Sequence, residues 1–351
     1  MITLPNNSGL IVLPNIISSI INENLAVSQN DYNNLNLPNT DIIFFNPTAT
    51  VKVTGINAQR NGKILKIFNS STDFLLIFTI NDTNSAVNNR LLGPAIPIFL
   101  FPDDGLEIIY DTSVNKWRVL EASHGKDFNQ FEFYTDGLDF PSTTAGYFRA
   151  IANGAGAVVG NSNTGANTVE RAIGNIDCNS GTTAAGNAYL ATPSSSGLSP
   201  VLGPYLFLSR VNVNTLSTLA ERFQPFIGLH DAAAGTNTTD GIYWTYRDEV
   251  NANWLFSVAS AGVRTENPSS KIVVAGEFIW LGFFVNGLGT RADYFLSSDS
   301  VNWLIEGSIA AGLPTVAQMV AMSTGINKTL GVTPRILSID FEGIRFATVR
   351  G

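Results

Sequence analysis

Residues able to perform acid–base or metal chemistry are few in this sequence. It contains two histidines, His124 and His230, and one cysteine, Cys178, which excludes a disulfide within the chain and a multi-cysteine metal site. His230 stands beside Asp231 and precedes Asp240, a set of side chains that could bind a metal or transfer a proton. Neither an HExxH motif nor an EF-hand spacing occurs. We interpret this segment as the end of a strand followed by a loop, and we expect no metal.

Carboxyl groups offer a second kind of chemistry, the hydrolysis of glycosides. The candidates lie in the second half of the chain and are Asp248, Glu249, Glu266, Glu277 and Glu306. Hydrolysis requires two carboxyl groups at a set separation across a sugar, which the order of residues does not define. No GxSxG nucleophile motif occurs, and the glycine-rich segment 154–156 lacks the GK[ST] of a phosphate-binding loop. We expect a protein that is not an enzyme and that uses no cofactor.

Aromatic side chains could instead stack on sugar rings. The candidates are Tyr243, Trp244, Tyr246, Trp254, Trp280 and Trp303. Because side chains alternate between the two faces of a strand, most of them are expected in a hydrophobic core. We predict that Tyr243 and Trp303 are the exposed members and contact a glycan.

The elements that must position these residues are short β-strands. In residues 41–121, Val51 and Val53 alternate with polar residues, and Asn61-Gly62 precedes the apolar run 64–68, which is a hairpin signal. Strand signals recur about every ten residues, which is typical of a small barrel or sandwich.

The second half has clearer alternation and more aromatic residues. The segment Phe278–Val285 is apolar at both alternating sets of positions, which predicts a central strand buried on both faces. We therefore expect an all-β protein, with a connector over residues 122–140 and a jelly-roll β-sandwich over residues 141–351.

Residues 1–40 are predicted to form an N-terminal arm. Five apolar residues fall at the spacings of one helix face: Ile16, Ile17, Ile20, Ile21 and Leu25. Such a short helix is unstable alone and needs a partner surface. It either packs on its own domain or anchors the chain to another protein, with the polar segment 30–40 as a free linker.

Composition narrows the classes of partner. The net charge is −8 and lysine and arginine occur singly, so no basic stripe for nucleic acid is present. No apolar run reaches the roughly 18 residues of a membrane-spanning helix, and we expect no membrane insertion. With 44% hydrophobic and 14% charged residues, the chain is expected to be folded rather than disordered.

Several motifs resemble those of phage head and tail fibre proteins. In the first half they are Val53–Ile56, Gly62–Asn69, Asn88–Leu91, Ile109–Asp111 and Lys116–Val119. In the second half, Ile227–Asp231, Asp240–Trp244 and Val332–Asp340 resemble the concanavalin-like jelly rolls of phage structural proteins.

The resemblance implies a non-enzymatic virion protein, a fibre, spike or capsid decoration that is made in the host cytoplasm and forms a homotrimer. Its partners would be a capsid or tail protein, bound through the N-terminal stripe, and a host-surface glycan. Two alternatives remain open. One is a lectin-like carbohydrate-binding protein outside any virus, and the other is a glycan-depolymerising tailspike.

Overall fold

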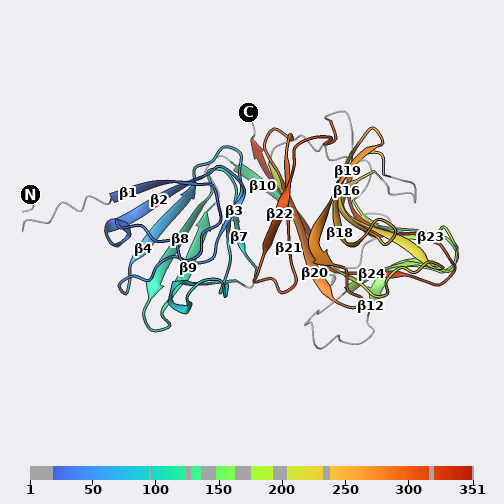
Figure 1. The fold of residues 1–351 in the computed structure, drawn as a ribbon, viewed down its shortest axis with the longest axis horizontal. Coiled ribbons are helices and arrows are strands. Elements are labelled where there is room, and N and C mark those ends of the chain that lie inside the picture. Colours follow the sequence, from blue (N-terminus) through green and yellow to red (C-terminus); the bar gives the residue numbers. More distant parts are fainter. Residues whose placement is uncertain are drawn as a thin grey trace, which may run out of the picture. The chain divides into compact units, whose positions relative to one another are not determined.

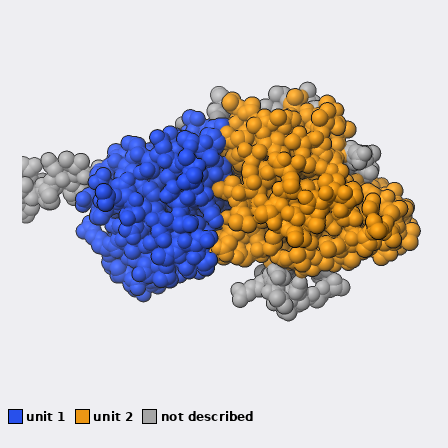
Figure 2. Space-filling view, in the orientation of Figure 1, with its two compact units in different colours: residues 1–125 blue, residues 126–351 orange. Residues whose placement is uncertain are grey.

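The computed structural model describes residues 19–94, 96–123, 128–135, 148–162, 175–192, 204–231, 238–315 and 320–349. The chain divides into two compact units, residues 1–125 and 126–351 (Figures 1 and 2). Regular structure in the described ranges consists of β-strands and two short 3₁₀ helices, which confirms the predicted all-β class. None of the described helices has the length and apolar character needed to cross a membrane.

The first unit contains two sheets around one apolar core. The six-stranded sheet has the order β1-β2-β4-β8-β9-β6, with bounds Ser19–Leu25, Thr40–Pro47, Ile64–Asn69, Gly105–Asp111, Lys116–Ser123 and Leu91–Leu92. The second sheet is β3-β5-β7, with bounds Val51–Val53, Leu76–Phe78 and Ile98–Leu100. The 3₁₀ helices η1 and η2 are Leu37–Asn39 and Val87–Asn89. Trp117 is fully buried, and its Nε1 donates a 2.9 Å hydrogen bond to the carbonyl oxygen of Ile56.

Part of the predicted arm belongs to the core of this unit. Residues 19–25 form strand β1, which pairs in parallel with β2, so the helical stripe is wrong for Ile20, Ile21 and Leu25. Ile21 and Leu25 are 6% and 2% exposed in the core, whereas Ile20 lies on the other face and is 54% exposed. The two-residue period of a strand places positions 21 and 25 on one face. Ile16 and Ile17 lie outside the described residues.

The segment predicted as a free linker is also packed into the first unit. Tyr32 is 5% exposed and stacks edge-on against Phe45, with 4.9 Å between ring centroids. Leu37 is fully buried. The folded unit therefore begins before residue 41, and residues 19–40 are structural rather than an anchor held apart from it.

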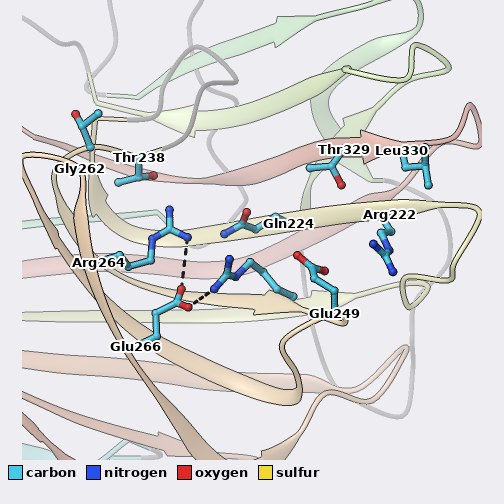
Figure 3. Close-up of a pocket in the computed structure, with 11 residues that line it drawn as sticks. Arg222, Gln224, Thr238, Glu249, Gly262, Arg264, Glu266, Thr329 and Leu330 are labelled. Carbon is cyan, nitrogen blue, oxygen red and sulfur yellow. Dashed lines mark hydrogen bonds and ion pairs between the residues drawn. The ribbon is translucent and has the colours of Figure 1, made fainter.

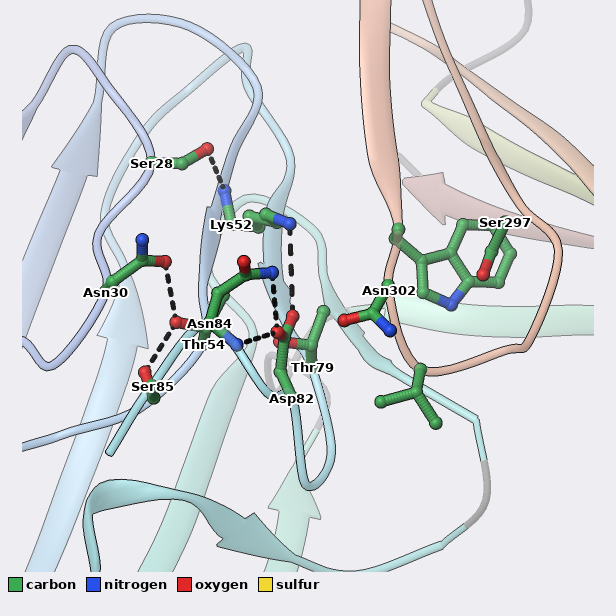
Figure 4. A network of polar contacts seen from close by, with 12 residues as sticks. Ser28, Asn30, Lys52, Thr54, Thr79, Asp82, Asn84, Ser85, Ser297 and Asn302 are labelled. Atoms are coloured by element: carbon green, nitrogen blue, oxygen red, sulfur yellow. Dashed lines mark hydrogen bonds and ion pairs between the residues drawn. The ribbon is translucent and has the colours of Figure 1, made fainter. Parts of the chain in front are cut away.

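A polar network joins the loops of the first unit (Figure 4). Asp82 is fully buried, and its carboxylate accepts hydrogen bonds from Thr79 Oγ1 at 2.9 Å and from Asn84 Nδ2 at 2.8 Å. Lys52 Nζ lies 3.9 Å from the same carboxylate. These contacts replace the water that a buried charge loses on folding, so this network is structural.

The second unit is a sandwich of two antiparallel sheets. The eight-stranded sheet has the path β12-β13-β24-β15-β20-β21-β22, and β10 also pairs with β24. The bounds in that order are Ala157–Ser162, Asn175–Ser180, Ile336–Val349, Tyr205–Val213, Phe278–Val285, Ala292–Ser297 and Leu304–Ile309, with β10 at Phe128–Thr135. The seven-stranded sheet has the order β11-β14-β23-β16-β17-β18-β19. Its bounds are Arg149–Asn153, Asn187–Ala191, Ala321–Leu330, Arg222–His230, Gly241–Arg247, Asn251–Ser260 and Val263–Ile272.

The chain moves repeatedly between these two sheets. It leaves β15 for β16 to β19 in the other sheet, returns for β20 to β22, and then crosses to β23 and back to β24. This connectivity gives the predicted jelly-roll sandwich. The central strand predicted at Phe278–Val285 is confirmed as β20, between β15 and β21. Strand β10 falls inside the predicted connector 122–140, so the second unit starts earlier than expected.

Aromatic side chains fill the space between the two sheets. Phe207 and Phe283 stack at 5.0 Å, and Phe256 and Tyr294 stack at 4.5 Å. Trp244 Nε1 donates across the sandwich to the carbonyl oxygen of residue 282, at 3.2 Å. This packing covers the inner face of the seven-stranded sheet and leaves the outer face available for a binding site.

Candidate functional site

A cavity of about 890 Å³ lies on the face of the seven-stranded sheet that points away from the core (Figure 3). Its lining comes from β16, β17, β19, β23 and the adjoining turns: Arg222, Gln224, Thr238, Thr239, Arg247, Glu249, Gly262, Arg264, Glu266, Thr329 and Leu330. Polar and charged side chains dominate this lining.

Strand alternation explains why polar residues gather on this face. On β16, Phe223 is in the core and the next residue, Gln224, lines the cavity. On β17, Tyr246 is in the core and Arg247 lines the cavity. Because successive side chains point to opposite faces, an apolar core on one side leaves the polar positions on the other.

Two arginines share one carboxylate in the cavity. Arg264 Nη1 lies 3.5 Å from Glu266 Oε1, and Arg247 Nη2 pairs with Glu266 Oε2. Ser257 Oγ donates a 2.9 Å hydrogen bond to Glu266 Oε1. The guanidinium carbon of Arg264 also lies 5.8 Å from the centroid of the Tyr243 ring, within the range of a cation–π contact. Glu266 is therefore fully engaged in holding the two arginines.

The other end of the cavity has a looser ion pair. Arg222 Nε lies 3.7 Å from Asp248 Oδ2, which is too long for a hydrogen bond. Among the described residues, Arg222 Nε and Asp248 Oδ1 are buried without a hydrogen-bond partner. Burial raises the pKa of Asp248 and a hydrogen bond with Glu249 raises this pKa further, whereas the positive charge of Arg222 lowers it.

Next to the cavity, His230 lies in a buried aromatic cluster on the same face of the sheet. Its ring is fully buried, with Nε2 3.0 Å from the carbonyl oxygen of Ser323 and the rings of Tyr189, Phe226 and Tyr243 within 5.9 Å. Burial lowers the pKa of His230 to about 4, so the ring is neutral at pH 7. Among the residues that the structure describes, no cluster of three or more His, Cys, Asp or Glu side chains could hold a metal.

The two acidic neighbours of His230 in the sequence stabilise loops. Asp231 Oδ1 accepts a 3.0 Å hydrogen bond from the backbone N–H of Thr239, and Asp240 Oδ1 accepts one of 2.7 Å from that of Ala261. The structural interpretation of this segment, a strand end followed by a loop, agrees with these contacts.

The two residues predicted to contact a glycan are buried. Tyr243 is 0% exposed and packs within the aromatic cluster. Trp303 is 1% exposed, its ring packs against Phe295 at 5.7 Å, and its Nε1 donates to the carbonyl oxygen of Ser300 at 2.8 Å. The prediction of exposed contacts at Tyr243 and Trp303 is therefore wrong. Facing away from the main core does not expose a large aromatic ring when other side chains cover it.

Sequence reasoning selected only part of this cavity. Of the five candidate carboxylates, Glu249 and Glu266 line it, whereas Glu277 pairs with Lys271 and Glu306 accepts hydrogen bonds from Ser270. The three arginines were missed because each stands alone in the sequence. The signal that could have found one of them is the alternation of Arg264 and Glu266 along β19.

Comparisons with known proteins give the following similarities. Residues 171–340 match the model of a family described as SO2946-like, C-terminal domain. No curated protein matches the sequence. A protein of unknown function, SO2946 from Shewanella oneidensis MR-1, is 16% identical, with 63% of this chain and 89% of that chain covered and a TM-score of 0.48. Peanut lectin in complex with a peptide is 11% identical, with coverage of 64% and 100% and a TM-score of 0.42. The beta-glucanase of Bacillus licheniformis is 10% identical, with coverage of 62% and 98% and a TM-score of 0.40.

Proposed function

We propose that this protein is a non-enzymatic attachment protein of a phage virion and that its second unit binds a carbohydrate of the host surface. The observation that carries the carbohydrate part is the polar cavity on the outward face of the seven-stranded sheet (Figure 3). Its volume of about 890 Å³ is within the range of small-molecule sites, and its lining offers planar guanidinium, carboxylate and amide groups. Such groups donate and accept hydrogen bonds in fixed directions, as sugar hydroxyls require.

The charges of the cavity favour binding over hydrolysis. A glycosidase needs two free carboxyl groups that flank the scissile bond, one of them able to deliver a proton. Glu266 is bound by Arg247, Arg264 and Ser257, so both its oxygens are engaged. Glu249 is the other carboxylate in the lining. With Glu266 held by two arginines and Glu249 hydrogen-bonded to Asp248, these carboxylates suit the recognition of hydroxyl groups better than acid–base catalysis.

The virion assignment is supported by the fibre-like motifs of the sequence, most of which fall in the first unit. That unit has its own hydrophobic core, separate from the core of the sandwich, so it can fold as a domain that serves attachment by itself. The buried positions of Ile21 and Leu25 move the proposed anchor from a helical stripe to the surface of the first unit. The proposed homotrimer predicts three times the 37.7 kDa chain mass in light scattering at micromolar concentration, and a monomer mass would contradict it.

A glycan array tests the binding function directly. The full chain is expected to bind a defined subset of glycans, and Gln224→Ala is expected to weaken that binding about tenfold because a direct hydrogen bond is lost. Arg118→Gln, which changes an exposed ion pair in the first unit, is the control and should bind as the wild type does. An array without any bound glycan would refute the carbohydrate function. Release of reducing ends from a bound polysaccharide would refute the non-enzymatic assignment.

The location is tested by mass spectrometry of purified particles. A fixed number of copies per particle is expected after density-gradient purification. Absence of the protein from particles, together with glycan binding by the isolated chain, would favour a lectin-like protein outside the virion.

A further inference from the structure

We infer that the cavity on the seven-stranded sheet selects sugars that carry an acidic group, a carboxylate or a sulfate. This inference rests on the proposed carbohydrate function and adds the class of ligand. It is drawn from an imbalance between hydrogen-bond donors and acceptors in the cavity, where arginine N–H groups are left without a partner among the described residues.

The first part of this imbalance is at Glu266. Arg247 and Arg264 both pair with this one carboxylate, and a guanidinium group has five N–H donors. A single carboxylate cannot accept hydrogen bonds from all the donors of two such groups. Among the described residues, Arg247 Nε is buried without a hydrogen-bond partner. This end of the cavity therefore retains an unused arginine donor.

The second part is at Arg222. Its side chain is 32% exposed, so a ligand can reach it, and its ion pair with Asp248 is 3.7 Å long. Its Nε has no hydrogen-bond partner among the described residues. Arg222 thus combines a side chain that a ligand can reach with a donor that has no partner among the described residues.

The chemistry of arginine indicates what would fill this deficit. The planar fork of a guanidinium matches the two oxygens of a carboxylate or a sulfate, and such charge-assisted pairs are roughly twice as strong as neutral hydrogen bonds. A neutral sugar would offer only hydroxyl groups to these donors. The whole chain carries a net charge of −8, which repels anions at long range, so the attraction must act at short range within the cavity.

The test uses pairs of probes that differ only in the acidic group. They are oligogalacturonate and its methyl ester, 3′-sialyllactose and lactose, and galactose 6-sulfate and galactose. Calorimetry on the full chain should show that, in at least one pair, the acidic member binds about tenfold more tightly or better. Arg222→Gln should reduce this preference to nearly equal affinities, and raising the salt concentration should weaken binding of the acidic member only. Arg118→Gln is the matched control and should retain the preference. The pairs also separate carboxylate from sulfate as the preferred group.

The outcomes separate this inference from the function on which it rests. Equal binding of acidic and neutral members would overturn the inference and leave the carbohydrate function intact. An acidic preference that persists in folded Arg222→Gln protein would overturn the assignment to this cavity. Binding of no probe and of no glycan on a neutral array would overturn the proposed function, and the inference with it.

Discussion

The buried glutamate of the sandwich should make the second unit less stable as the pH rises. Glu342 lies on β24 opposite Ser209 of β15 and is 0% exposed, and neither of its carboxyl oxygens has a hydrogen-bond partner among the described residues. Burial raises its pKa from 4.5 to about 8. The polar side chain of Thr324, on the facing sheet, lowers this pKa and so cancels only part of the rise. The group is therefore protonated in the folded protein at neutral pH and ionised in the unfolded chain.

The direction and size of the effect follow from proton linkage. Because the folded protein binds the proton more tightly, the stability is fully present below about pH 4.5 and is lost progressively as the pH rises to about 8. One pKa unit corresponds to about 1.4 kcal/mol, so the complete loss is about 5 kcal/mol, of which about 4 kcal/mol falls between pH 5 and pH 9. Glu342→Gln removes the ionisation and keeps nearly the same shape.

Urea unfolding of the wild type and of Glu342→Gln at several pH values measures this difference. Four of the five tryptophans lie in the second unit, so intrinsic fluorescence mainly reports its unfolding. The two proteins should differ little at pH 5, and the variant should be about 4 kcal/mol more stable relative to the wild type at pH 9. Glu277→Gln, which changes a carboxylate partly exposed beside Lys271, is the matched control and should follow the wild type. A difference between wild type and Glu342→Gln that is constant from pH 5 to pH 9 would refute the reasoning.

Three further variants test other parts of the structure. Burial lowers the pKa of His230 to about 4, so the stability that its neutral ring supplies is present above about pH 6.5 and is lost as the pH falls to about 4. In urea titrations over that range, the free energy of unfolding of the wild type should fall by about 3 kcal/mol relative to that of His230→Gln. Parallel pH profiles of the two proteins would contradict this. Gly325→Ala should lower the melting temperature of the second unit, because the added Cβ clashes with the carbonyl oxygen of Ala188 on the paired strand; an unchanged value would contradict the register of β14 and β23. Leu25→Asp should destabilise the first unit by about 4 kcal/mol, which limited proteolysis would detect as cleavage within residues 19–123. Asn22→Asp, at an exposed position of the same strand, is the control and should have little effect. Equal resistance of the two variants to the protease would contradict a core position for β1.

The strands with strong local patterns could be predicted from the sequence. Phe278–Val285 is apolar at every position but one, and in a β-rich chain a run of this length indicates a strand covered on both faces, so its central position could be predicted. The stripe at Ile20, Ile21 and Leu25 was ambiguous, because residues four apart share a face in a strand as well as in a helix. The pairing with β2, which comes from residues far along the chain, decided the outcome.

The turn at Asn61-Gly62 illustrates a similar limit. Gly62 has a φ of +74°, as a tight turn requires, but β4 then pairs with β2 in parallel and with β8, and does not form the expected local hairpin. A short-range signal fixed the turn, whereas long-range packing chose the partners of the strand.

The cavity was beyond sequence reasoning for the same reason. Arg222 and Leu330 meet because β16 pairs with β23, and Arg264 joins them through β17, β18 and β19. A single arginine in a sequence gives no local pattern from which its contacts with distant residues can be predicted. The alternation rule did place Tyr243 on the face opposite Trp244, but it could not show that the ring is covered.

The position of β24 has a consequence for how the protein is made. This strand, Ile336–Val349, follows all other described strands in the chain, yet it lies between β13 and β15 and also pairs with β10. During translation, the eight-stranded sheet therefore stays divided until the ribosome has released residue 349. Until then, β13 and β15 present unpaired backbone groups and half of a hydrophobic core, which are sites of aggregation. The first unit, whose described strands pair only with one another, can fold long before that moment. Synthesis on slow ribosomes or without chaperones should thus yield chains with a folded first unit and a misassembled second one.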